Sequence, residues 1–372
     1  MKKLLALSLS LLMIVLLVAC GGDGGTSTPS STPDASGSTP APSTDGYEIA
    51  MITDIGNIDD KSFNQGTWEG VQMYGTANNI THQYYKPTEQ SDDAYLQAID
   101  LAIQGGAKII VTPGYLFENP IGTAQAQYPD VHFILIDGNP TGGAAENAVG
   151  ITYAEEQSGY LAGYAAVKDG YTSLGFMGGM AVPAVVRFGF GYVQGANDAA
   201  AELGITVDMK YFYTGGFEAT PEAQAMAASW YQGGTEVIFG CGGSVGNSVF
   251  AAAEAAGAKA IGVDVDQSAE SETIITSAIK GLRESVNLVL GQYYAGNFPG
   301  GEAQTLGAAD DAVGIPMETS RFETFTQADY DAIFGEIAAG NVCIPKDSDS
   351  TSASPADIAA GFANVNLDVV TQ

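Results

Sequence analysis

The sequence is poor in basic residues, with 13 lysines and arginines against 43 aspartates and glutamates among 372 residues. Its formal net charge is −30 and its pI is about 4.1. Binding to nucleic acid requires a basic face that replaces the counterions of the phosphates, so this charge balance excludes a nucleic-acid partner. A polybasic patch on a membrane surface is excluded for the same reason.

Histidine and cysteine are also scarce, at two and three residues. They leave little material for a zinc site or a histidine-dependent triad, and the chain has no Walker lysine motif. We therefore expect no metal, no cofactor and no ATP hydrolysis by this chain itself. Sequence spacing does not decide whether Cys241 and Cys343 form a disulfide, because that depends on their distance in the fold.

The first twenty residues are predicted to be a targeting signal. Lys2 and Lys3 precede the apolar run Leu4–Ala19, which is shorter than the roughly 20 residues that span a bilayer. The run ends in Ala19-Cys20-Gly21, which resembles a bacterial lipobox. Residues 1–19 are thus expected to be a lipoprotein signal peptide and Cys20 the lipidated residue; a transmembrane anchor and an ordinary secretory signal are the alternatives.

A low-complexity segment follows, and 21 of the 26 residues from Gly21 to Gly46 are Gly, Ser, Thr or Pro. Such a composition buries too little apolar surface to fold, so residues 20–46 are predicted to be a lipidated, disordered tether. The folded body would then be held at the cell membrane through the lipid anchor only, facing the extracytoplasmic side.

From Tyr47 onward, short apolar runs alternate with helix-length segments, which predicts βαβ units and parallel sheets. The predicted strands of a first series are 48–53, 82–85, 108–112, 131–136 and 148–151, and those of a second series are 173–177, 207–213, 236–239, 260–263 and 273–277. The predicted helices are 63–77, 93–104, 160–168, 183–203, 221–232 and 244–256. Two series indicate an α/β fold with two doubly wound parallel-sheet lobes joined by a hinge.

The break between the two series falls near residues 153–157, and the chain is then expected to return. Helix 282–294 would pack on the first lobe and segment 302–315 on the second. The predicted N-terminal lobe is therefore 47–154 plus about 281–301, and the predicted C-terminal lobe is 155–280 plus about 302–372, with a ligand cleft between them.

Two glycine patterns concern helix packing. Gly159-x-x-x-Gly163 predicts close packing of two helices. The series Gly189, Gly191 and Gly195 imitates a dinucleotide fingerprint, but it lies inside a predicted helix rather than between a strand and a helix, so we do not expect a dinucleotide site there.

Ligands of open α/β sheets bind at the carboxyl ends of the strands. In this chain those ends carry mainly aspartates and glycines: Asp54-Ile55-Gly56, Pro113-Gly114-Tyr115, Asp137-Gly138, Gly178-Gly179, Gly240–Gly243 and Asp264–Gln267. Carboxylates accept hydrogen bonds from hydroxyl and amine groups, and glycines let a ligand approach the backbone. These positions are the candidate binding site.

One of these strand ends leads into a predicted helix. Ser62 and Gln65 have the spacing of a capping box, so the helix should begin near Phe63. An aromatic ring, the Asn64 amide and the Asp54 carboxylate would then lie at one sheet edge. A nucleobase could stack on the ring, with about 1–3 kcal/mol, and donate N–H groups to the carboxylate. The alternative is structural: Phe63 covers the core and Asp54 fixes a turn.

The segment Asp54–Gln65 closely resembles the opening motif of the Bmp/PnrA family of substrate-binding lipoproteins, the purine-nucleoside receptors of ABC importers. Further family-like blocks follow in order: Tyr160–Gly163, Gly175–Gly179, Phe188–Gly195, Ile261–Ser268 and Thr276–Lys280. The resemblance covers about residues 48–280 well and the tail loosely. It implies a type I periplasmic-binding-protein-like fold, a nucleoside ligand with a purine base, ABC permease and ATPase partners, a monomer and no enzymatic activity.

The resemblance also assigns roles to individual residues. It implies Asp54, Asn64 and Asp137 as base contacts and Phe63 as one stacking wall. It implies Asp264 as the carboxylate on the ribose hydroxyls, Lys280 as a cation near the sugar and Gly240 as backbone against the ribose. The second stacking wall stays open between Phe188 and Phe217. Tyr115 stands where the family often has phenylalanine, and we expect it to line the pocket.

Other functions remain as alternatives. Receptors for a sugar or another small metabolite on this fold also end a strand in Gly-Val-Asp and carry an arginine near the position of Arg187. A more remote alternative is an exported nucleoside-processing enzyme, but neither histidine is placed to activate water and no metal site is expected. The preferred nucleoside, binding of pyrimidines and an added surface or adhesion role stay open.

Overall fold

The computed structural model describes residues 46–349 and 354–371. The predicted signal peptide, Cys20 and the tether up to Asp45 lie outside these ranges. In the described part of the chain, no helix is both long enough and apolar enough to cross a membrane.

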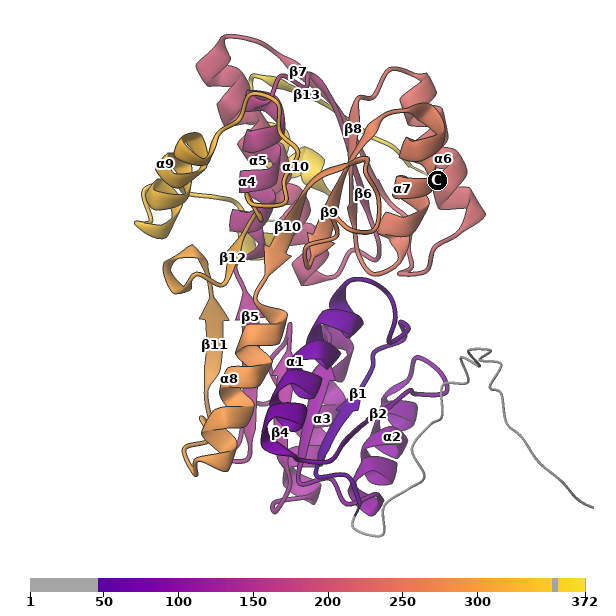
Figure 1. Ribbon diagram of the computed structural model, residues 1–372, viewed down its shortest axis with the longest axis vertical. Coiled ribbons are helices and arrows are strands. Elements are labelled where there is room, and N and C mark those ends of the chain that lie inside the picture. The colour runs from indigo at the N-terminus through magenta and orange to yellow at the C-terminus, as the bar shows by residue number, and fades with distance from the viewer. Residues whose placement is uncertain (1–45, 350–353, 372) are drawn as a thin grey trace, which may run out of the picture. The chain divides into compact units, whose positions relative to one another are not determined.

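The first sheet lies in the lower part of Figure 1. Within the described residues it has six parallel strands, in the order β11-β5-β4-β3-β1-β2. Its strands are β1 (Ile49–Ile52), β2 (His82–Tyr85), β3 (Ile109–Pro113), β4 (His132–Ile136), β5 (Ala148–Tyr153) and β11 (Ala303–Leu306). Its helices are α1 (Phe63–Asn78), α2 (Asp92–Gln104), α3 (Glu118–Gln127) and α8 (Leu282–Tyr294). We call this sheet and its helices the first lobe.

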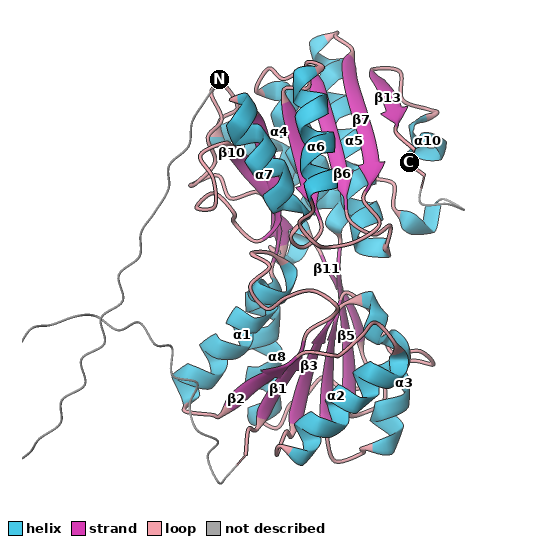
Figure 2. Ribbon diagram, turned by 90° about the vertical axis from the view of Figure 1, so that its right-hand side faces the viewer, coloured by secondary structure: helices cyan, strands magenta, loops and turns pink. Residues whose placement is uncertain are grey.

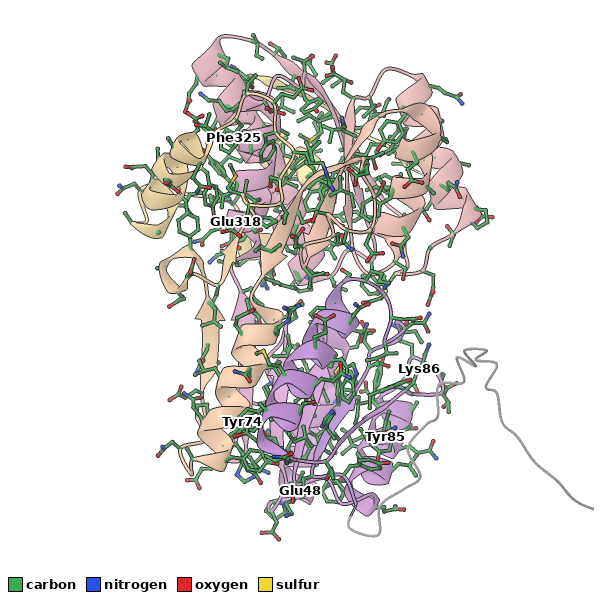
Figure 3. All side chains as sticks on the ribbon, viewed as in Figure 1. Glu48, Tyr74, Tyr85, Lys86, Glu318 and Phe325 are labelled. Carbon is green, nitrogen blue, oxygen red and sulfur yellow. The ribbon has the colours of Figure 1, made fainter. Side chains whose placement is uncertain are left out.

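Helices cover both faces of the first sheet. In β1, Ile49 and Met51 belong to the core beneath α1 and α8, whereas Ala50 and Ile52 belong to the core beneath α2 and α3. All four residues are fully buried, which explains why this strand is a continuous apolar run rather than an alternating one. Tyr74, labelled in Figure 3, stacks on Tyr294 with ring centroids 5.4 Å apart and thereby fastens α8 to α1.

The second sheet has seven strands within the described residues, in the order β12-β10-β9-β8-β6-β7-β13, and all neighbours are parallel except β10 and β12. Its strands are β6 (Ser173–Gly178), β7 (Val207–Tyr213), β8 (Val237–Cys241), β9 (Lys259–Asp264), β10 (Ile274–Lys280), β12 (Val313–Gly314) and β13 (Val365–Val369). Helices α6 (Pro221–Gln232) and α7 (Val245–Ala256) cover one face, and α4 (Glu155–Lys168) and α5 (Pro183–Leu203) cover the other (Figure 2). The chain adds α9 (Gln327–Ala338) and α10 (Pro355–Ala359). These elements form the second lobe.

Helices α4 and α5 pack with their backbones in contact. Gly159 and Gly163 each face a backbone carbonyl of α5, and Gly191 and Gly195 each face a backbone carbonyl of α4. A Cβ at any of the four positions would collide with that carbonyl. The structure thus confirms the predicted close helix packing and places the glycine series 189–195 inside α5.

The predicted α/β fold with two parallel sheets is confirmed, but the last crossing between the sheets was predicted wrongly. Segment 302–315 was expected in the second lobe, yet Ala303–Leu306 form β11, which pairs with β5 in the first sheet. Only β12, further along this segment, joins the second sheet. β11 is a four-residue edge strand with no buried residue, so no apolar run marks it in the sequence.

Candidate functional site

A cavity at the carboxyl ends of the strands is lined by residues of both lobes. Nine of the ten predicted ligand-binding residues line it: Asp54, Phe63, Asn64, Tyr115, Asp137, Phe188, Phe217, Asp264 and Lys280. Val185 and Glu218 also line it, and the sequence did not single them out.

The loop before α1 holds Asp54 and Asn64 together. The Asn64 side chain donates from Nδ2 to Oδ1 of Asp54 (2.8 Å) and to Oδ2 of Asp60 (3.0 Å), and its Oδ1 accepts from the Asp54 amide. Oδ1 of Asp54 also accepts from the Gly56 amide at 2.6 Å. Because both amide atoms of Asn64 are engaged, this side chain orients the Asp54 carboxylate in addition to lining the cavity.

Helix α1 begins at Phe63, as predicted, but the capping box does not form. Asp60 caps the helix instead, because its carboxylate accepts from the backbone amides of Ser62, Asn64 and Gln65. The Ser62 hydroxyl donates to Oδ2 of Asp264, at 2.5 Å, at the end of β9 in the second lobe. A partner that is distant in sequence therefore takes the hydroxyl that a local motif would have used.

The environment of Asp54 raises the pKa of its carboxyl group. Burial raises the pKa of this carboxyl to about 6, although the hydrogen bonds from Asn64 and Gly56 act in the opposite direction. Asp54 is therefore a buried carboxylate that is ionised at neutral pH at a cost in stability. An N–H donor from a ligand would offset that cost.

The second half of the cavity is built around the Lys280 ammonium, whose side chain is only 2% exposed. It makes a short ion pair with Asp137, and it lies 3.5 Å from Oδ1 of Asp264 and 3.6 Å from Oε1 of Glu155. Burial alone would lower the pKa of Lys280, but the three carboxylates together raise it above its usual value. The ammonium therefore stays charged and holds residues of both lobes together.

One carboxylate oxygen of Asp137 has no partner among the described residues, despite this ion pair. Its Oδ2 binds Lys280, whereas its Oδ1 is buried and has no hydrogen-bond partner among the described residues. Burial raises the pKa of Asp137 to about 6, even though the Lys280 ammonium acts to lower it. A buried acceptor without a partner is costly, and a donor on a ligand would relieve it.

The backbone at both carboxylates is left-handed. Asp137 has φ +59° and Asp264 has φ +69°, a region that non-glycine residues adopt infrequently and that aspartate tolerates better than most. Strained residues of this kind concentrate at functional sites, where the surrounding structure holds them in place. Here they turn both carboxylates from the strand ends into the cavity.

Aromatic rings surround the same ammonium. The Lys280 Nζ lies 4.6 Å from the ring centroid of Phe63, on α1, and 5.6 Å from that of Phe188, on α5. Both rings line the cavity, so the two lobes each contribute an aromatic face near the cation. Phe217 also lines the cavity, but its ring rests on the backbone of Gly179 and Gly242.

Gly240, which was expected to bring backbone against the ribose, lies away from the cavity. Gly240 is not among the residues that line the cavity; it lies within β8 and faces Gly246 of α7, where an added Cβ would come within 2.9 Å of a Cα. The strand runs two residues further than predicted, which puts Cys241 and Gly242 at the cavity instead.

The sequence left open whether Cys241 and Cys343 form a disulfide. In the structure both are free thiols, Cys241 buried and Cys343 exposed, so no disulfide joins them.

Behind the cavity lie three paired charged side chains, Glu155, Arg187 and Asp347, whose pairing was not predicted from the sequence. Glu155 accepts from Nη1 of Arg187 at 2.9 Å, and Nε of Arg187 donates to Asp347 at 2.7 Å. None of these three residues lines the cavity. Because β5 ends at Tyr153, two residues later than predicted, Glu155 follows a strand end closely, and that position was the available signal.

The fold and the placement of the cavity are those of solute-binding proteins with the type I periplasmic fold. The structure is similar to a solved ABC transporter solute-binding protein from Aeropyrum pernix K1, with a TM-score of 0.76 and 21% identity over 84% of this chain and 97% of that one. It is also similar to one from Conexibacter woesei, with a TM-score of 0.66 and 24% identity over 81% and 99%. At these identities the likeness establishes the fold.

The family follows from the sequence. The model of the PnrA-like ABC transporter substrate-binding proteins (Bmp) matches residues 47–348, and the chain belongs to this family. It is 29% identical to the ABC transporter nucleoside-binding protein BmpA of Lactococcus lactis, over 90% of this chain and 98% of that protein. It is 30% identical to a CD4+ T-cell-stimulating antigen of Listeria innocua, over 93% and 99%.

These relationships confirm the predicted family and class: the chain is a substrate-binding protein of an ABC transporter and not an enzyme. Proteins of this class work on the extracytoplasmic side of a membrane and pass their ligand to a permease. In the described part of the chain, no group of three or more histidine, cysteine, aspartate or glutamate side chains could hold a metal ion.

Proposed function

We propose that the protein captures a nucleoside with a purine base in this cavity and delivers it to an ABC permease. The base would stack on Phe63, with Phe188 as the facing ring, and its N–H groups would donate to Asp54 and Asp137. The ribose hydroxyls would donate to Asp264 and lie near Lys280. The related Lactococcus lactis protein is described as nucleoside-binding.

One observation carries the proposal: the same cavity joins aromatic rings from both lobes with buried acceptors and a single buried cation. The flat rings suit a planar base, and the acceptors suit N–H and O–H donors. Oδ1 of Asp137, buried and without a partner among the described residues, supports a ligand that brings a donor to that point.

The sugar alternative finds less support in this geometry. Sugar receptors of this fold share both the Gly-Val-Asp strand end and an arginine near position 187, so Asp264 alone does not distinguish a nucleoside from a sugar. Here Arg187 does not line the cavity, because Glu155 and Asp347 engage its guanidinium.

The ribose contact can be tested with Asp264→Asn. Asparagine also tolerates the left-handed backbone, so the change removes the charge without the strain that alanine would add. Adenosine should bind about 1.5 kcal/mol more weakly to the variant, the difference between a charged and a neutral hydrogen bond. 2′,3′-Dideoxyadenosine, which lacks the hydroxyls, should lose little. Titration calorimetry with both ligands, and with the inosine pair, measures this.

The ligand pair serves as the control, because any general damage to the site weakens both members equally. Equal losses for adenosine and its dideoxy form would remove Asp264 from the ribose. If the unmodified protein, unfolded and refolded to release carried-over ligand, binds no nucleoside but does bind a sugar, the nucleoside proposal itself is wrong.

We also propose that Cys20 carries the lipid that holds the protein on the membrane, with residues 1–19 removed as a signal peptide and the tether 20–46 linking the lipid to the folded body. The support is the apolar run that ends in Ala19-Cys20-Gly21, together with the Gly/Ser/Thr/Pro composition that follows. Several acyl chains would be needed, since one chain alone binds a membrane only marginally.

Cys20→Ala should abolish lipidation, because the thioether to the lipid requires the thiol. Cells that express the unmodified protein should incorporate labelled fatty acid into it and retain it in the membrane fraction, whereas the variant should do neither. Cys343→Ala, which removes the exposed free thiol, is the matched control and should be labelled normally. Equal labelling of the Cys20→Ala variant would refute the lipid anchor.

A further inference from the structure

Behind the cavity, Glu155 is a fully buried carboxylate at the first residue of α4. It does not line the cavity and contacts no position that the proposed ligand would occupy. A buried carboxylate is tolerated only when cations or hydrogen bonds compensate it. Glu155 has two such cations, one on each oxygen.

The two oxygens serve different partners. Oε2 accepts a hydrogen bond from Nη1 of Arg187 at 2.9 Å, while Oε1 lies 3.6 Å from Nζ of Lys280 and has no hydrogen bond among the described residues. Arg187 is itself held by the Asp347 carboxylate and by the backbone carbonyl of Tyr153. The Arg187 side therefore fixes the carboxylate, and its other oxygen is directed at the ammonium.

The position of the Lys280 ammonium depends on a carboxylate that is fixed in this way. Its ammonium lies among three carboxylates, and two of them, Asp137 and Asp264, line the cavity and are the proposed ligand contacts. A ligand hydroxyl that approaches Asp264 changes the attraction on the cavity side of the ammonium. Glu155 is the carboxylate that such a ligand does not touch, so its attraction stays constant when the cavity is filled.

From this arrangement we infer that Glu155 is a positioning residue for ligand binding, which holds the Lys280 ammonium in the place where it meets the ribose hydroxyls. The inference rests on the proposed nucleoside function and adds a residue outside the cavity to it. Arg187 acts with Glu155, because it fixes the carboxylate and balances its charge.

The test is Glu155→Gln, which keeps the shape of the side chain and removes its charge. Adenosine should bind about tenfold more weakly to this variant, which is less than the roughly 30-fold minimum for removal of a direct partner of a buried charge, because Glu155 acts on the ligand only through Lys280. Binding of 2′,3′-dideoxyadenosine should change by no more than about twofold, because that ligand has no hydroxyls to meet the displaced ammonium. The inosine pair should show the same pattern.

Glu156→Gln is the matched control. Glu156 is the next residue in the same helical turn, is also buried, and forms no ion pair with Lys280 in the described part of the chain. Its replacement should leave both affinities unchanged. Should Glu155→Gln fail to fold, Glu155→Asp keeps the charge and withdraws it from Lys280, and it should still weaken adenosine more than the dideoxy ligand.

The outcomes separate the two proposals. If the unmodified protein binds none of these nucleosides, the proposed function fails. If it binds them and Glu155→Gln weakens adenosine and dideoxyadenosine equally, Glu155 supports only the fold and the inference is overturned. An unchanged affinity for both ligands in a folded Glu155→Gln variant would overturn it as well.

Discussion

Replacement of Lys280 by methionine should reduce the free energy of unfolding of the ligand-free protein by about 3–5 kcal/mol, the range found when one partner of a buried ion pair is removed. Methionine fills a similar space, so the loss reflects charge rather than a cavity. Asp137, Asp264 and Glu155 would remain buried without the ammonium that all three face. Denaturant-induced unfolding at pH 7.5 measures the change.

The control is Lys108→Met, since the Lys108 side chain is 60% exposed and its pair with Glu48 lies on the surface. That change should cost less than about 1 kcal/mol. The loss in Lys280→Met should also shrink as the pH falls towards 5, because the stranded carboxylates can then take up protons. A loss below about 1 kcal/mol at pH 7.5 would mean that the ammonium does not hold the cluster together.

Asp54→Asn should have the opposite effect on stability. Burial raises the pKa of Asp54 in the folded protein to about 6, above its ordinary value of 3.8. The native state therefore binds a proton more tightly than the unfolded chain does, and stability falls as the pH rises from about 4 to about 6. Asparagine carries no such cost, so the variant should be about 1–3 kcal/mol more stable at pH 7.5.

Two measurements check this second prediction. Unfolding curves between pH 4.5 and pH 7.5 should show that the difference between Asp54→Asn and the unmodified protein is small at low pH and grows as the pH rises through 6. Adenosine should bind the variant about 2–3 kcal/mol more weakly, because an amide N–H would replace the proposed acceptor. Asp59→Asn, which changes an exposed carboxylate of the same loop, should alter neither property.

An Asp54→Asn variant that is less stable at every pH would show that the carboxylate is needed to organise the loop through Asn64 and Gly56. An unchanged affinity for adenosine would remove Asp54 from the base. The two results are independent, since the first concerns the ligand-free protein and the second the complex.

The sequence predicted the alternation of strands and helices, because this alternation depends on local patterns. It thereby also predicted the carboxyl ends of the strands, where the cavity lined by nine of the ten candidate residues lies. β1 is a continuous apolar run since helices cover both of its faces, and Asp137 directly follows β4 since ligands of such sheets meet the carboxyl ends of strands. The family resemblance then selected among the residues at those ends.

What the sequence did not predict depends on contacts between distant segments. Ser62 was expected to cap its own helix, but Asp264 takes its hydroxyl and Asp60 supplies the cap. The pairing of Glu155 with Lys280 joins residues far apart in the chain, so no spacing rule could have suggested it. β11 was not predicted, because this short edge strand is held by its hydrogen bonds to β5 and has no buried apolar residues that would mark it in the sequence.

The path of the chain limits how the two lobes can be exchanged. Within the described residues it passes between the sheets three times: after β5, after β10, and between β11 and β12. Residues 47–154 alone would leave the outer edge of β5 unpaired and the α8 side of α1 uncovered, and a bare strand edge invites aggregation. A chimaera that combines one lobe of this protein with the other lobe of a relative therefore needs three junctions, and a single cut cannot yield two sound halves.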